Sequence, residues 1–248
     1  MKHLSLACLL LMAISSAGQH IQQEPYDFPI KPGSDEWRKF QSGMEMVQAC
    51  QLPQDIMRKL STEALARTCL SYPLIGNIYA YEDLQTGLRR IIAEFNGLQE
   101  LLLRDDAGSE LMKFYSEMKP SNLNQNWSLL EKGEFSFDFL TIEMLLAQNE
   151  IINTLSKEQR KQLVSDGLNK FKEKEVLIET FGGHGLTTSA FLIAKVLDIE
   201  RALDGKPAEL GAGETTRESF EVFLNHAVPL NENVILDVIT NAQSYINQ

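Results

Sequence analysis

The sequence lacks the short motifs that mark common catalytic and metal sites. It has no HExxH or CxxC pair for zinc, no GxSxG nucleophile turn, and no Walker lysine behind a glycine-rich loop. Beyond the N-terminal segment, its histidines are only His20, His184 and His226, which are far apart along the chain. These absences favour a non-enzymatic protein, and we predict no metal site, no catalytic residues and no cofactor.

Basic residues are scarce. The chain has 23 Lys and Arg against 34 Asp and Glu, a net charge of −11, with no basic run and no interleaving of basic and aromatic residues. Such a charge repels nucleic acids and anionic lipid surfaces. We therefore expect a protein or peptide partner and no nucleic acid.

Long apolar runs are missing except at the N-terminus. There, Lys2 precedes an apolar stretch from Leu4 to Ile14, and small residues follow from Ser15 to Gly18. This order predicts a signal peptide over residues 1–18, cleaved after Ala17 or Gly18, because a membrane span needs about 20 apolar residues. The alternative is a short anchor that stays attached. The first interpretation predicts a mature protein that does not span a membrane and is exported to the periplasm, the cell envelope or the outside.

Cysteine is rare, and Cys8 would leave with the signal peptide. Cys50 and Cys69 remain, an even number in an oxidising compartment. A disulfide between them would close a loop of about 20 residues and stabilise the fold by roughly 3 kcal/mol. The alternative is two small buried thiols on facing helices.

Helical signals dominate the rest, so we predict an all-α fold. Apolar spacings and capping residues favour an irregular array of 8–10 helices in antiparallel hairpins, with a repeat-like α-α superhelix as a variant. Residues 19–33, with three prolines, are expected to form an extended tail that could lie along the domain. Residues 34–248 would form one helical domain, or two lobes at 34–119 and 127–248.

Some elements are predicted in detail. One helix is expected from Ser34 to about Gln51 and another from Glu82 to Arg104, with Gly87 and Gly97 as sites of kinking or close packing. Ser156 with Gln159 forms a capping box, Thr215 with Glu218 another, and residues 204–216 are predicted to be a loop.

The most suggestive string is glycine-rich. Its residues are Gly182, Gly183, His184, Gly185, Thr187 and Thr188. Backbone N–H groups at a helix N-terminus could bind an anion there, with His184 supplying a proton or a ligand. The alternative is a tight turn with a threonine N-cap, in which positive φ angles at Gly183 or Gly185 would make a side chain strained.

Carboxylates occur in pairs at helical spacing. Glu134 and Asp138 are four residues apart, and Glu143 and Glu150 are seven apart. Two carboxylates across a cleft could serve a glycosidase, but in an acidic protein such pairs are more typical of solvated surface.

Several segments carry a resemblance. Gln51-Leu52-Pro53, Leu60-Ser61-Thr62, Cys69-Leu70-Ser71-Tyr72-Pro73-Leu74, Phe95-Asn96-Gly97-Leu98-Gln99-Glu100-Leu101 and Arg104-Asp105-Asp106-Ala107-Gly108 together resemble an uncharacterised family of secreted helical proteins from bacteria. The similarity covers roughly residues 45–120. It implies an envelope or extracellular setting and an all-α fold, and it implies no activity.

Two functions are therefore expected to compete. The first is a secreted or periplasmic helical scaffold that binds a protein or peptide, because stacked helical hairpins present extended surfaces. The second is a small-ligand or anion binder, or a hydrolytic enzyme, that uses the His184 loop. A deep pocket with a carboxylate beside His184 would favour the second, whereas an open surface would favour the first.

Overall fold

The structure is a computed structural model that describes residues 21–205 and 216–247. Within these ranges the chain forms helices and no strand, apart from an isolated bridge between Gln22 and Leu60. The predicted all-α fold is confirmed. The predicted signal peptide at 1–18 and most of the loop predicted at 204–216 lie outside the described residues.

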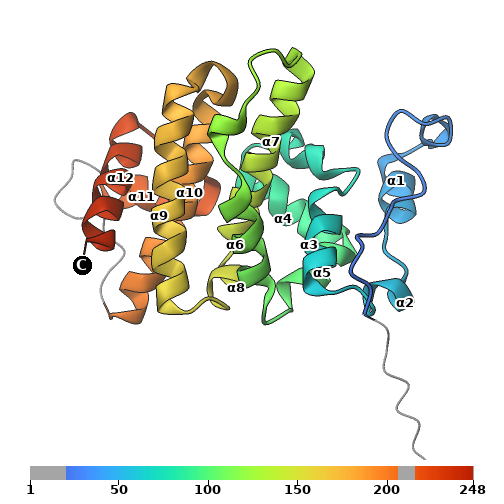
Figure 1. The fold of residues 1–248 in the computed structure, drawn as a ribbon, viewed down its shortest axis with the longest axis horizontal. Coiled ribbons are helices and arrows are strands. Elements are labelled where there is room, and N and C mark those ends of the chain that lie inside the picture. The colour runs from blue at the N-terminus through green and yellow to red at the C-terminus, as the bar shows by residue number, and fades with distance from the viewer. Residues whose placement is uncertain (1–20, 206–215, 248) are drawn as a thin grey trace, which may run out of the picture.

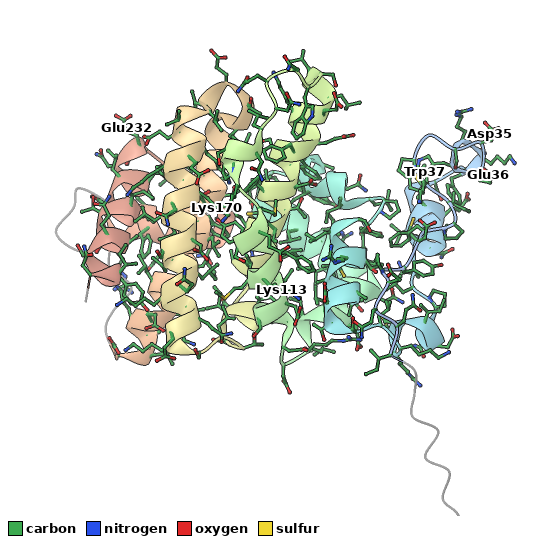
Figure 2. All side chains as sticks on the ribbon, in the orientation of Figure 1. Asp35, Glu36, Trp37, Lys113, Lys170 and Glu232 are labelled. Atoms are coloured by element: carbon green, nitrogen blue, oxygen red, sulfur yellow. The ribbon has the colours of Figure 1, made fainter. Side chains whose placement is uncertain are left out.

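The helices follow one another along the long axis of the molecule, roughly in chain order (Figure 1). The first part contains η1 (Trp37–Lys39), α1 (Gly43–Ala49), α2 (Gln54–Met57), α3 (Thr62–Leu70), η2 (Ile75–Ala80), α4 (Leu84–Glu94), α5 (Asn96–Leu102) and α6 (Ala107–Glu117). The second part contains η3 (Pro120–Asn122), α7 (Leu129–Leu146), α8 (Asn149–Ile152), α9 (Lys157–Val176), α10 (Ile178–Leu203), α11 (Arg217–His226) and α12 (Glu232–Ile246). Helices η1 and α1 lie at one end of the array, where Asp35 and Glu36 project outward (Figure 2), and α11 and α12 lie at the other.

Side-chain caps start many of these helices. The predicted capping box at Ser156 is present, with both reciprocal hydrogen bonds to Gln159, and Ser128 forms a second box that the sequence analysis missed. The predicted cap of α11 is one residue too early, because Thr216 is the N-cap and its hydroxyl accepts the Ser219 N–H. Each such bond satisfies a backbone donor that the first turn would leave free.

Two predicted long helices are broken. The helix expected from Ser34 stops after Lys39, because Phe40 is extended and Ser42 caps a separate helix, α1. The helix expected over 82–104 splits at Phe95, which is also extended. The side chain of Asn96 bonds both the N–H and the C=O of Leu52, so a distant backbone segment holds this break open.

Close packing explains the glycines flagged in that region. A Cβ on Gly87 would collide with the backbone carbonyl of Ile78 in η2, and one on Gly97 would collide with the Phe95 ring. The expectation of close approach is thus confirmed at both positions.

The buried apolar side chains form one continuous cluster that runs from Phe28 to Ala242. The extended N-terminal segment belongs to it, since Phe28 packs edge-on against Tyr72 and the Tyr26 N–H donates to Thr68. The described residues therefore share one core, and the tail lies along the domain as expected.

The centre of the array is a helical hairpin. A single residue, Leu177, separates α9 from α10, and α10 packs against both α9 and α7. Helix lengths follow no fixed period along the chain, so the repeat-like arrangement stays a prediction. Among the described helices, none is both long and apolar enough to cross a membrane.

Candidate functional site

A groove opens between η2, α7 and the first half of α10, with a volume of about 490 Å³. It contains the predicted residues His184 and Gly185. We call it the aromatic groove, and its lining is Gly76, Tyr79, Gly133, Glu134, Ser136, Phe137, Leu140, Thr180, Phe181, His184 and Gly185. The N-terminal end of α7 and the junction of α9 and α10 lie at the same end of the molecule (Figure 1).

One wall of the groove is a single face of α7. Gly133, Phe137 and Leu140 recur at the spacing that places side chains on one side of a helix. The Ser128–Glu131 capping box starts this helix one turn earlier. A Cβ on Gly133 would meet nothing within 4 Å, so this wall is low and open at that point.

Aromatic rings form the other boundaries. The Tyr79 ring lies 5.7 Å from Phe137 and 6.2 Å from His184, measured between centroids. Tyr79 is 53% exposed, whereas Phe181 is buried against Phe139. Its partial burial raises the pKa of the Tyr79 hydroxyl above the ordinary value of about 10, so the group is neutral at physiological pH.

The third wall is bent. Helix α10 is interrupted at Gly182, whose φ of 59° and ψ of −172° are not helical. The predicted turn is therefore real, but the positive φ falls on Gly182 and not on Gly183 or Gly185. Gly183 has open space around it, and Gly185 is tight for a different reason, since a Cβ there would lie 2.8 Å from the Phe181 Cβ.

The two threonines are not caps. Thr187 and Thr188 both lie inside α10 and are buried, so the predicted threonine N-cap is wrong. The Thr188 hydroxyl instead donates to Glu143 at 2.6 Å. The helix resumes before Thr187 because the single glycine break at Gly182 is enough to turn the chain.

Behind the groove lies a buried ionic cluster, which consists of Tyr115, Glu143, Lys174, Thr188 and Ser189. The Lys174 ammonium donates to both oxygens of the Glu143 carboxylate at 2.7 Å. The hydroxyls of Tyr115 and Ser189 donate to the same carboxylate at 2.8 and 2.7 Å. Four helices, α6, α7, α9 and α10, are thereby tied to one carboxylate.

The cluster is sealed from solvent. The side chains of Glu143 and Lys174 are both 0% exposed. Burial raises the pKa of Tyr115, and the Glu143 carboxylate raises it further. Burial likewise lowers the pKa of Lys174, against the opposing effect of Glu143. Lys170 lies just outside, on α9 (Figure 2), with its ammonium 4.4 Å from the centre of the Tyr115 ring.

The cluster also supports the groove. The Lys174 ammonium donates to the Gly185 carbonyl at 3.2 Å and lies 5.5 Å from the centre of the Phe181 ring. Both of these residues line the groove. The ion pair therefore holds the segment that carries His184.

The carboxylate pairs do not form a two-carboxylate cleft. Glu134 lines the aromatic groove, whereas Asp138 lines a second concavity of about 650 Å³ between α3, α6 and α7. Burial raises the pKa of Asp138, and the nearby Glu134 adds to this. Glu143 was expected on the surface and is buried; Glu150 is exposed and lines a third, polar concavity with Lys195.

Of the residues predicted in the glycine-rich segment, His184 and Gly185 line the aromatic groove, and Thr188 belongs to the buried ionic cluster. Tyr79, Phe137 and Lys174 were not predicted from the sequence. For the cluster a signal existed, since Glu143 is the one charged residue in the apolar stretch from Phe139 to Ala147. A lone charge in such a run is buried with a partner when the helix is central.

Cys50 and Cys69 are free thiols, and both are buried. Burial raises the pKa of each, which keeps them protonated and unreactive. Both are buried, as in the second arrangement considered from the sequence, but Cys50 is the C-cap residue after α1 and only Cys69 lies within a helix, α3. Within the described ranges no three His, Cys, Asp or Glu side chains gather as a metal site would require.

No family model matches this sequence, and no curated protein or solved structure proved similar to it. The resemblance to secreted helical bacterial proteins therefore stays a prediction.

Proposed function

We propose that this chain is a non-enzymatic binding protein that holds a segment of a protein or peptide partner in the aromatic groove. The observation that carries the proposal is a contrast between two sites. The groove is open and bordered by partly exposed rings, whereas the ion pair of Glu143 and Lys174 behind it is sealed from solvent. Concave sites with aromatic walls and few polar groups are typical of ligand binding.

The buried ionic cluster does not fit a catalytic role. Ser189 lies 3.0 Å from the Lys174 ammonium, a pairing that can activate a serine nucleophile. A nucleophile must reach its substrate, however, and Ser189 is fully buried and donates to Glu143. The cluster is better explained as a structural support.

His184 fits a binding surface. It is exposed at the edge of the groove and contacts the Tyr79 ring edge-on. It makes no hydrogen bond with any described residue, so no carboxylate orients its imidazole as a general base requires. Glu134 lines the same groove, which is why acid-base chemistry at His184 is the alternative to be tested.

A blocked groove provides the test. Gly133→Trp would place a large side chain across the open wall, and Gly133→Ala is the matched control because its methyl group meets nothing. Peptides selected by phage display on the unmodified protein should lose binding to Gly133→Trp and keep it with Gly133→Ala and His184→Ala. Equal binding to all the variants would place the partner elsewhere and refute the proposal.

A second measurement addresses the alternative. Chromogenic esters, phosphates and glycosides would be assayed with the unmodified protein and with His184→Ala. We expect no turnover by either protein. Turnover that disappears in His184→Ala, while thermal stability is unchanged, would identify an enzyme.

We also propose that the protein acts after export from the cell, as the order of Lys2, apolar run and small residues predicts. N-terminal sequencing of material exported by the native host should find a chain that starts at Gly18 or Gln19. A chain that still starts at Met1 in the envelope fraction would contradict this.

A further inference from the structure

We propose that the aromatic groove recognises a lysine or arginine side chain of its protein partner, with Tyr79, Phe137 and Glu134 as the recognising groups. This inference rests on the proposed function and adds the chemistry of the occupant.

The aromatic groove carries negative charge, which favours a cation as its occupant. Glu134 is its carboxylate, and neither a lysine nor an arginine is part of the described lining. The Glu134 side chain is exposed and forms no ion pair with any described residue. A cation in the groove would therefore find a free carboxylate and no lysine or arginine in the lining.

The aromatic rings of the groove also favour a cation. Tyr79 and Phe137 both line the groove, with ring centres 5.7 Å apart and planes tilted by 37°. Aromatic faces carry negative charge density and attract ammonium and guanidinium groups. The same pairing occurs elsewhere in the fold, where the Arg67 guanidinium lies 4.4 Å from the centre of the Phe114 ring.

The groove's surroundings indicate that the cation belongs to a protein segment. Leu130, 72% exposed, continues the lining face of α7 by one turn, and Ile178, 44% exposed, does so for the segment that carries Phe181. These side chains would contact apolar residues that flank the cation in a peptide. A free small cation would leave them uncovered.

Long-range charge supports the same occupant. Glu131, Glu175 and Glu179 are exposed and flank the lining segments of α7 and α10. With a net charge of −11, the chain attracts basic partners and repels acidic ones. A basic segment with flanking apolar residues is thus complementary in both charge and polarity.

The test uses matched pentapeptides with the order leucine, serine, X, serine, leucine, acetylated and amidated at the ends. X is lysine, arginine, the uncharged isostere norleucine, or glutamate. Binding is followed by amide chemical shifts, with Gly133 and Gly185 as reporters at the groove. We expect the lysine and arginine peptides to bind about tenfold more tightly than the norleucine peptide, and higher salt to weaken only the charged ones.

Variants identify the recognising groups. Tyr79→Leu and Glu134→Gln should each weaken the lysine peptide several-fold while leaving the norleucine peptide nearly unchanged. Tyr81→Leu removes a nearby exposed ring that does not line the groove, and Glu36→Gln removes a carboxylate at the far end of the array (Figure 2). Neither control should change the affinity.

The outcomes separate the two proposals. Equal affinity for lysine and norleucine, tighter binding of glutamate, or a free alkylammonium ion that binds as tightly as the peptide would overturn the inference. If such binding is still lost in Gly133→Trp, the groove remains the binding site and only the cation preference fails. If no peptide shifts the groove amides, both this inference and the proposed function are refuted.

Discussion

The buried ion pair between Glu143 and Lys174 leads to the sharpest stability prediction. Lys174→Met removes the ammonium and leaves the carboxylate in the core, where the hydroxyls of Tyr115, Thr188 and Ser189 still donate to it. Glu143→Leu does the reverse. It leaves the ammonium with only neutral oxygen acceptors and removes the carboxylate to which the Tyr115, Thr188 and Ser189 hydroxyls donate.

The size of the stability loss depends on which charged group remains buried without its partner. Breaking a buried ion pair from one side costs about 3–5 kcal/mol, because a charge stays in the core without its partner. Lys174→Met should lie near the lower figure, since the remaining hydroxyls solvate the carboxylate in part. Glu143→Leu should lie near the upper one. For a chain of this size, such losses lower the midpoint of thermal unfolding by roughly 6–20 °C.

The double variant decides whether the charge itself is the cause. Glu143→Leu with Lys174→Met removes both charges and replaces them with apolar groups of similar size. It should therefore be more stable than the sum of the two single losses predicts. The assay is urea and thermal unfolding followed by circular dichroism. Arg217→Met, which breaks the exposed pair with Glu221, serves as the control and should change stability little.

Two results would refute this reasoning. One is a loss below about 1 kcal/mol in either single variant, similar to an exposed pair. The other is a double variant whose loss equals the sum of the single losses, because the charges would then be uncoupled.

The remaining predictions concern single positions. Gly133→Ala should raise the free energy of unfolding by about 1 kcal/mol, since its methyl group meets no other atom. Gly87→Ala should lower it by about 1–3 kcal/mol, because its methyl group collides with the backbone of η2. Equal effects of the two substitutions in urea unfolding would contradict this packing. Asp83→Ala should cost about 1 kcal/mol, because Asp83 caps α4 and bonds His226. Burial acts to raise the pKa of Asp83, but its hydrogen bonds outweigh this and hold the pKa below the ordinary value. Its stabilisation is thus present above the ordinary aspartate pKa of about 4 and is lost as the pH falls further, through the lowered pKa of the folded state. A cost for Asp83→Ala that is unchanged in acid would contradict this assignment.

Local signals in the sequence account for much of the helical content. Ser156 caps α9 in the predicted capping box, and the N-cap of α11 lies one residue from the predicted position. Such signals work because a cap bonds a backbone N–H only three residues away. They need no information from the rest of the chain.

Helix breaks caused by contacts with distant segments of the chain could not be predicted from these local patterns. The apolar spacing across Phe95 is that of a continuous helix, yet Asn96 bonds the backbone of Leu52 and the helix divides there. The lining of the aromatic groove could not be predicted from local patterns either. The glycine string predicted a bend near His184, but Tyr79 and Phe137 reach it from elements distant in sequence.

The sequence by itself determined the helical class of this protein, some of the helix starts and the acidic charge, because these follow from composition and from contacts within one turn of a helix. Only the tertiary structure decided that Glu143 and Lys174 meet in the core and that rings from η2, α7 and α10 enclose a groove. Those features depend on which helix faces pack together, and that choice is made by the shape and burial of the whole core.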